Sequence, residues 1–326
     1  MLAPDYATAF WVTNPQQGEM RREILKPPGQ DEVHVRTLYS GVSRGTESLV
    51  FTGRVPESEF ARMQAPFQKG EFPGPVKYGY CSVGLVEQGP SELLNKSIFC
   101  LFPHQDHYVV PASAVIPIPA NVPAQRAVLA ANMETAVNGV WDAEPMLGEQ
   151  VCVIGAGVIG ALVAYLCNQI PGVNVHLIDI NPEREAIAAH LGVAFSTPDQ
   201  APHNQDCAIH ASGHPDGLRQ GLDLLGNEGR LIEMSWFGEG DVTLPLGGAF
   251  HSQRLTLRAS QVGQLPAKLL SRWDYRRRLT LALSLLADER LDVLVSGESD
   301  FYDFSALAPH LLGPGGTALC HRLRYS

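Results

Sequence analysis

The chain has 326 residues, of which 45% are hydrophobic, and this length favours two domains with a sizeable core. Its net charge is −10, from 24 basic and 34 acidic residues, which argues against a nucleic-acid binder. The N-terminus lacks signal-peptide features and no apolar run approaches the ~18 residues of a membrane span. The six cysteines form no C-x-x-C pair, so we expect reduced thiols and a cytoplasmic protein without membrane contact.

The first 120 residues carry the pattern of a β-rich domain. Apolar or alternating runs, separated by glycine and proline turn signals, predict strands at 7–12, 32–38, 83–87, 97–102 and 107–110. A connector punctuated by prolines follows, and residues 124–142 then predict a helix.

The next segment contains a complete dinucleotide-binding pattern. Residues 151–154 predict a buried strand, residues 161–168 a helix, and residues 173–178 a second strand that ends in Asp179. A G-x-G-x-x-G sequence joins the first strand to the helix. This sequence alone is a weak signal, but strand, glycines, helix and terminal acid together predict a Rossmann fold.

Each element of that pattern has a physical task. Gly155 permits the tight turn, Gly157 lets a pyrophosphate approach the backbone, and Gly160 lets the helix pack on the strand. The helix N-terminus favours the phosphate charge. Asp179 accepts hydrogen bonds from the ribose hydroxyls and repels a 2′-phosphate, so the expected cofactor is NAD(H).

The remainder of the chain alternates strands with helices, which predicts a parallel sheet. Helices are expected at 183–191, 216–225 and 275–287, and strands at 206–210, 230–234 and 254–260. The final 40 residues predict short strands and turns. We therefore expect a discontinuous first domain, residues 1–122 completed by 286–326, around a nucleotide-binding domain at 123–285.

Several segments resemble the medium-chain dehydrogenase/reductase superfamily, the zinc alcohol dehydrogenase-like proteins, over essentially the whole chain. They are GVSRGTE at 41–47, KYGYCSVGLVEQG at 77–89, ANMETAVNGV at 131–140, the GAGVIG loop, and HASG at 210–213. The resemblance implies an α/β fold class: a Rossmann doubly wound parallel sheet plus a GroES-like β-barrel catalytic domain. It also implies an active site in the cleft between the domains and a homodimer.

The sequence departs from the family at its metal positions. Where zinc members have a catalytic cysteine, a histidine–glutamate pair and a third ligand, this chain has Ser43, Tyr80 with Cys81, and Ala131. The lobe of four cysteines that holds a structural zinc is also missing. We expect neither zinc, because such sites need thiolate, imidazole or carboxylate ligands. The S-x-G-T-E turn and the following G-Y resemble the zinc-free branch that includes bacteriochlorophyllide a dehydrogenase.

The catalytic candidates follow from those departures. Tyr80 takes the place of the metal's histidine ligand and would donate a proton or hydrogen bond to a substrate oxygen; the alternative is a tyrosine that fills the vacant metal site. Ser43 and Thr46 would complete a hydroxyl relay, or cap the local turn. Arg44 would bind the cofactor pyrophosphate, or form a surface ion pair. Glu47 is expected to accept hydrogen bonds from backbone donors.

Two further residues are candidates for the substrate pocket. Phe102 corresponds to a pocket aromatic of the family, although core packing explains it as well. His104 is a candidate for the pocket mouth. His104 and His107 lie three residues apart, but two ligands on a turn without a third make a poor zinc site.

The resemblance also assigns cofactor contacts in the second domain. Thr135 faces the nicotinamide and Ile159 packs behind its ring. The Ser212–Gly213 turn and Ser260 fall where family members bind the adenosine side and the carboxamide, or they are ordinary strand ends.

Together these observations predict a zinc-independent, NAD(H)-dependent oxidoreductase acting on a small or medium carbonyl or alcohol compound. One alternative is a zinc-free enone or quinone reductase. Another, of a different class, is an NAD(H)-binding sensor or scaffold without efficient catalysis.

Overall fold

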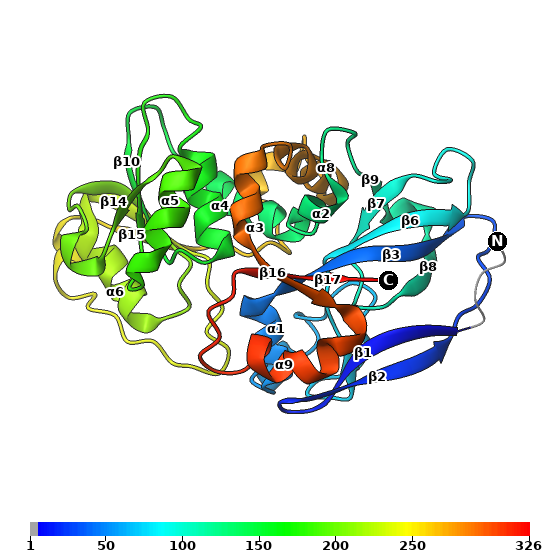
Figure 1. The fold of residues 1–326 in the computed structure, drawn as a ribbon. Coiled ribbons are helices and arrows are strands. Elements are labelled where there is room, and N and C mark those ends of the chain that lie inside the picture. The colour runs from blue at the N-terminus through cyan, green and yellow to red at the C-terminus, as the bar shows by residue number, and fades with distance from the viewer. Residues whose placement is uncertain (1–5) are drawn as a thin grey trace. The chain divides into compact units, whose positions relative to one another are not determined.

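The structure, a computed structural model, describes residues 6–326 (Figure 1). The chain divides into two compact units, Met1–Ala131 with Leu283–Ser326, and Asn132–Ala282. We call them the β-rich unit and the α/β unit. Within residues 6–326, no helix combines the length and the apolar character that crossing a membrane requires.

The β-rich unit contains two sheets. One has the strand order β2-β1-β5-β4, and the other β16-β17-β3-β6-β7-β9, with β8 also paired to β3. The strands are β1 Tyr6–Asn14, β2 Gln17–Ile24, β3 Glu32–Ser43, β4 Lys69–Gly70, β5 Val76–Lys77, β6 Ser82–Gln88, β7 Ser97–Cys100, β8 His107–Pro111, β9 Ile116–Pro117, β16 Val295–Asp300 and β17 Cys320–Arg324. The helices are α1 Arg44–Phe51, α2 Ala124–Ala127 and α9 Phe304–Leu312, with short 3-10 turns at Glu57–Glu59, Ala112–Ala114, Glu289–Leu294 and Phe301–Asp303.

The α/β unit is built on one six-stranded parallel sheet of order β12-β11-β10-β13-β14-β15. Its strands are β10 Gln150–Ile154, β11 Asn174–Ile178, β12 Ala194–Ser196, β13 Gln205–His210, β14 Leu225–Glu233 and β15 Thr256–Ala259. Its helices are α4 Val158–Cys167, α5 Glu185–Leu191, α6 Pro215–Leu224 and α7 Ala249–Ser252, with 3-10 turns at Pro182–Arg184, Pro198–Gln200 and Ala267–Leu269. The chain passes between the units within α3 Ala130–Ala143 and α8 Tyr275–Leu285.

The order of that sheet confirms the predicted doubly wound fold. Successive strands run outward from β10 to β11 and β12 on one side, and from β13 to β15 on the other, with α4, α5 and α6 packed around them (Figure 1). The order therefore reverses between β10 and β13. In open parallel sheets, ligands bind beyond the carboxyl ends of the strands at such a reversal.

Apolar alternation builds the core of the larger sheet in the β-rich unit. Val33 and Val35 of β3, Val86 of β6, and Tyr108 and Val110 of β8 belong to one buried cluster. Alternate residues of a strand point to opposite faces, so the residues between them occupy the other face of this sheet. His34, Glu87 and His107 are among those alternate residues.

Two local expectations were wrong, and two further elements were not predicted. The 41–47 turn is the end of β3 followed by α1, and the helix predicted at 124–142 divides into α2 and α3. The division occurs where Leu129 N–H donates to the Arg126 carbonyl, a tighter bond than the α-helical one. β2 and α9 were not predicted, because β2 is rich in charge and α9 contains Pro309.

Candidate functional site

The glycine-rich loop of the α/β unit follows β10 directly. Gly155 has φ +102°, and a Cβ there would lie 2.6 Å from the Ser212 backbone, so this position requires a glycine. A Cβ on Gly160 would lie 1.8 Å from the Gly155 carbonyl oxygen, whereas one on Gly157 would meet nothing within 4 Å. The loop is therefore closed on its packing side and open beside Gly157, where α4 begins with Ile159 half-buried in its first turn.

Asp179 lies at the carboxyl end of β11 and is fixed from two sides. Its Oδ2 accepts a hydrogen bond from Ala156 N at 2.7 Å, and its Oδ1 accepts one from Asn181 N at 2.8 Å. Each carboxylate oxygen retains acceptor capacity for a further donor. Because Ala156 belongs to the glycine-rich loop, the structure brings the predicted phosphate-binding loop and the predicted ribose acceptor together.

The Ser212–Gly213 turn lies across the strand reversal, next to Gly155. Ser212 Oγ is 2.6 Å from the Nε2 atom of the buried His210, and His210 Nδ1 is 2.8 Å from Glu233. Gly213 N donates to Ser235 Oγ at 3.0 Å. His210 and Glu233 thus hold the turn in place.

His210 was given no functional role in the sequence interpretation. The sequence does contain a sign of its role, because His210 and Glu233 are polar residues that each end a strand directly after apolar residues. In the structure they are register partners in the parallel pair β13–β14. Polar residues at the carboxyl ends of adjacent parallel strands mark the edge where ligands bind.

Ser260 belongs to a buried polar network rather than to an open surface. Its hydroxyl donates to Asp142 Oδ2 at 2.7 Å, and the Asn138 side chain also donates to that atom, at 3.2 Å. Arg278 joins the network through Asn138 and through Glu134 at 3.0 Å. Burial raises the pKa of Glu134, and Arg278 opposes that rise. Thr135, on the same helix α3, is half-buried.

In the β-rich unit, the candidate site begins where β3 ends. Ser43 is the last residue of β3, and its backbone N–H donates to Glu47 Oε1 of α1 at 2.7 Å. This contact confirms that Glu47 accepts from the backbone. Tyr80, half-buried beyond β5, is hydrogen-bonded to Ser43. Thr46 is half-buried on α1, and no hydrogen bond among residues 6–326 joins its side chain to Tyr80.

Glu47 also connects this site to His104. Glu47 Oε2 is 2.9 Å from His104 Nε2, and both side chains are buried, at 5% and 1% exposure. His104 Nδ1 is 2.7 Å from Ser40 Oγ, which is 2.9 Å from the Tyr325 hydroxyl. His104 therefore lies inside a closed chain of polar groups, and a position at a pocket mouth stays a prediction. A cavity of about 10 Å³, with Glu47, His104 and Tyr78 in its wall, leaves room for roughly one water.

A glycine makes this close approach possible. Gly79 has φ +118°, and a Cβ there would lie 2.8 Å from His104 Cδ2. Gly79 separates Tyr78 from Tyr80, whose rings meet edge to face at 6.0 Å. The K-Y-G-Y sequence thus places two phenols beside the buried Glu47–His104 pair.

Burial and nearby acidic groups keep the Tyr80 phenol and the Cys81 thiol protonated. Burial raises the pKa of Tyr80 well above its usual value, and nearby Tyr78, Cys81 and Glu47 add to that rise, while the bond to Ser43 opposes it. Burial, Glu47 and Cys320 likewise raise the pKa of the Cys81 thiol. All six cysteines carry free thiols.

Phe102 is a core residue in this structure. Its ring stacks on Tyr108 at 3.9 Å and 10°, and its exposure is 6%. The ammonium of Lys77 lies 5.7 Å from the same ring, and Lys77 also contacts Glu23 Oε2 at 2.9 Å. Burial lowers the pKa of Lys77 to about 8, although Glu23 opposes that shift. Contact of Phe102 with substrate stays a prediction.

Comparisons with known proteins agree with this architecture. No protein-family profile matches the chain. An L-threonine 3-dehydrogenase of Xanthomonas campestris pv. campestris is 28% identical over 204 residues, which cover 60% of this chain and 57% of that protein. The match thus spans little more than half the length of this curated relative.

The same fold recurs in solved structures. A short-chain alcohol dehydrogenase of E. coli CFT073, complexed with NADH, aligns with a TM-score of 0.78 at 17% identity, over 98% of this chain and 100% of that one. A Sinorhizobium meliloti 1021 protein bound to NADP aligns with a TM-score of 0.77 at 16% identity, over 98% and 100% of the two chains.

The chain is thus similar to dehydrogenases in part of its sequence and shares the fold of solved dehydrogenases. The first of these structural neighbours holds NADH and the second holds NADP. At the positions that the resemblance assigns to metal ligands, this chain has Ser43, Tyr80 and Ala131.

Proposed function

We propose that this chain is a member of the medium-chain dehydrogenase/reductase superfamily and acts as an NAD(H)-dependent oxidoreductase. It transfers hydride between nicotinamide and a small or medium-sized carbonyl or alcohol compound, without catalytic zinc. The observation that carries the proposal is the loop of the α/β unit, where the space beside Gly157 is open and Asp179 is fixed by Ala156 N. The cofactor, when bound, supplies or accepts the hydride, while the protein contributes binding, orientation and electrostatics.

The residues of the α/β unit fit a dinucleotide. The open side of Gly157 and the N-terminus of α4 would receive the pyrophosphate, and Asp179 would accept from the ribose hydroxyls. The other proposed contacts are Gly155, Gly160, Ile159, Thr135, Ser212, Gly213 and Ser260. The proposed pyrophosphate contact of Arg44 rests on the superfamily resemblance.

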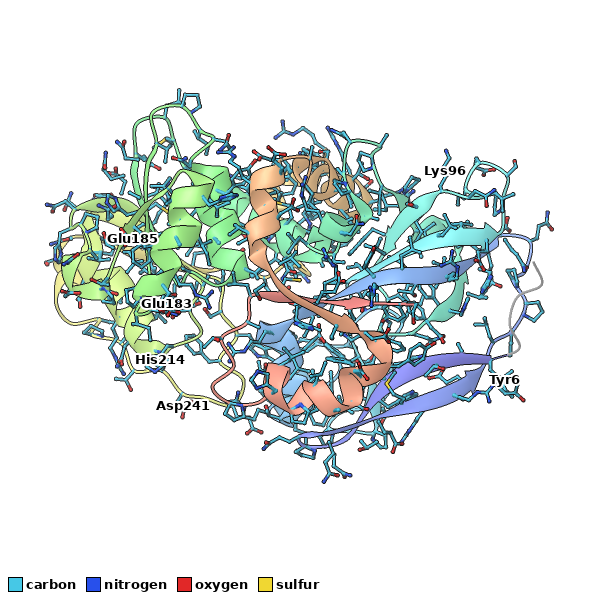
Figure 2. The ribbon with its side chains drawn as sticks, viewed as in Figure 1. Tyr6, Lys96, Glu183, Glu185, His214 and Asp241 are labelled. Carbon is cyan, nitrogen blue, oxygen red and sulfur yellow. The ribbon has the colours of Figure 1, made fainter. Side chains whose placement is uncertain are left out.

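The surroundings of Asp179 support NAD(H) over NADP(H). The Asp179 carboxylate would repel a 2′-phosphate. Arg184 is the residue that threatens this preference, but Glu183 and Glu185, both exposed and labelled in Figure 2, flank it at the start of α5. The carboxylates of Asp179, Glu183 and Glu185 outnumber the single Arg184 guanidinium, so the local charge disfavours a phosphate.

The donor set does not fit a catalytic zinc. Ala131 has no ligand atom, and Ser43 and Tyr80 offer hydroxyls rather than the thiolate and imidazole that zinc favours. Cys81 is adjacent, but one thiol does not complete a zinc site. No step of the proposed reaction therefore passes through a metal at these positions.

Tyr80 is the group that we propose to act on the substrate oxygen. Its raised pKa keeps the phenol protonated through neutral pH, which suits a hydrogen-bond or proton donor and not a base. The buried Glu47 carboxylate contributes to that rise and fixes Ser43, the partner of Tyr80. A donor aimed at developing negative charge stabilises the transition state of carbonyl reduction.

A screen of NADH oxidation with aldehydes, ketones, enones and quinones tests the proposal. Turnover of aldehydes or ketones supports it, and turnover of enones or quinones alone favours the double-bond reductase. Tight NADH binding without any turnover favours the sensor or scaffold. The homodimer and the cytoplasmic location remain predictions, which light scattering and cell fractionation test.

A zinc assay tests the metal part of the proposal separately. Full turnover by chelator-treated protein is expected. Loss of turnover that returns on addition of zinc would contradict zinc independence.

A further inference from the structure

Two histidines and a glutamate converge on one face of the larger sheet in the β-rich unit. His34 lies on β3, Glu87 on β6 and His107 on β8, and β3 pairs with both of the other strands. Their neighbours Val33, Val35, Val86 and Tyr108 belong to the apolar cluster of the opposite face. One potential ligand atom from each of the three residues lies within 4.8 Å of the other two.

His34 has an unexplained polar atom. The side chain is fully buried, and its Nδ1 has no hydrogen-bond partner among the described residues. The nearest carboxylate oxygen, Glu87 Oε2, lies 3.7 Å from this nitrogen, beyond hydrogen-bond length. A buried polar atom without a partner calls for a group such as an ion or a water.

The second ring nitrogen of His34 faces His107, and the second oxygen of Glu87 faces away from the donor of Arg36. His34 Nε2 lies 3.3 Å from His107 Nδ1, with the two rings nearly parallel at 10°. Arg36 donates to Glu87 Oε1 at 2.7 Å, which leaves Oε2 available. Its charge opposes a bound cation, but the Glu87 carboxylate offsets it.

His34 can offer only one of its two nitrogens to a single ion. The separation that then applies is either 3.7 Å from Nδ1 to Glu87 Oε2 or 3.3 Å from Nε2 to His107 Nδ1, and each is close to the spacing of two ligand atoms on one ion. Ligand atoms on one tetrahedral ion lie about 3.3 Å apart, given metal–ligand bonds of about 2.0–2.2 Å. Two imidazoles with one carboxylate are a ligand set found in zinc sites, with water in the remaining position.

We propose that His34, Glu87 and His107 bind one divalent transition-metal ion, which ties β6, β3 and β8 together. The site is separate from the zinc positions of the superfamily, Ser43, Tyr80 and Ala131, and includes no residue of the proposed catalytic group. It goes beyond the proposed oxidoreductase function and does not depend on it.

Calorimetric titration of chelator-treated, untagged protein with ZnCl₂ tests the proposal. Wild type should bind one equivalent, and its melting temperature should rise by roughly 4 °C when free zinc is a hundredfold above Kd. Glu87→Gln and His107→Gln should each weaken zinc binding at least tenfold. The control His190→Gln, which removes an exposed histidine of α5, should bind as wild type does.

Two results would overturn the site. Unchanged zinc affinity in both variants would place the ion elsewhere. Absence of saturable binding to wild type would mean that the partner of His34 Nδ1 is water. Glu87→Gln keeps the size of a side chain that is 20% exposed, so it decides the question by itself if His107→Gln does not fold.

Discussion

The two units carry their candidate sites in different ways. In the α/β unit, the dinucleotide loop and Asp179 come from 30 consecutive residues, and the chemistry lies mostly in the backbone and one carboxylate. In the β-rich unit, the site is a closed network of side chains that joins Ser40, Glu47, His104 and Tyr325. The loop of the α/β unit has open space beside Gly157, whereas the side chains of the β-rich network are hydrogen-bonded to one another.

This difference has a consequence for mutagenesis. A change in the open loop removes space or a ligand contact, and its effect is local. A change in the closed network also leaves a buried partner unsatisfied, so its effect on stability is harder to separate from its effect on chemistry. Conservative substitutions with paired controls are therefore needed in both units.

Tyr80→Phe should have the largest effect. Removing a donor that acts on developing charge costs roughly 2.7–4 kcal/mol, so kcat should fall about 10²–10³-fold. KM should change less, because the contact forms mainly in the transition state. The measurement is kcat, KM and melting temperature on a substrate found in the screen. A rate within about threefold of wild type, far below that effect, would reduce Tyr80 to a packing residue.

The glycine-rich loop offers a matched pair. Gly160→Ala should lower the free energy of unfolding by about 3 kcal/mol, because its Cβ would lie 1.8 Å from the Gly155 oxygen. Gly157→Ala should leave that free energy within about 0.5 kcal/mol of wild type. It should nevertheless weaken NADH binding at least tenfold, because the added methyl enters the open space. Denaturant melts and fluorescence titration measure both, and unimpaired NADH binding by Gly157→Ala would place the pyrophosphate elsewhere.

Asp179→Asn should have an intermediate effect on cofactor choice. Hydrogen bonds to a charged group contribute about 1.5–3 kcal/mol, so NADH binding should weaken by about tenfold or more. NADPH should gain relative to NADH, since the repelling charge is gone. Fluorescence titration of both cofactors measures this, with Asp223→Asn, an exposed carboxylate of α6, as the control. Wild type that binds NADPH as tightly as NADH would contradict the assignment.

Lys77 should give the smallest effect, a pH dependence of stability. The pKa of Lys77 is about 8 in the folded state, whereas its ordinary pKa, expected in the unfolded state, is 10.5. Between these two pH values the unfolded state therefore binds more protons. Stability should therefore rise with pH in this window, by about 1 kcal/mol from pH 7 to 9. Lys77→Met should lack this rise, and Lys69→Met, which removes the exposed neighbour, should retain it. Identical pH profiles for wild type and Lys77→Met would contradict the prediction.

The sequence by itself determined the α/β unit with most of its ligand-binding loop. Strand, glycines, helix and acid lie within one short segment, and the need for a glycine is a backbone property that local sequence expresses. The parallel sheet followed from strand–helix alternation. The prediction that no catalytic zinc is bound also came from the sequence, because ligand chemistry is a property of residue type.

Only the tertiary structure decided the rest. His104 meets Ser40 64 residues away, and Ser40 meets Tyr325 285 residues away, so no local pattern contains these contacts. Strand pairing likewise brings His34 and Glu87 to His107, and burial places Phe102 in the core. These outcomes depend on sheet register and on which side chains lose water, which are set by long-range packing and not by neighbours in the chain.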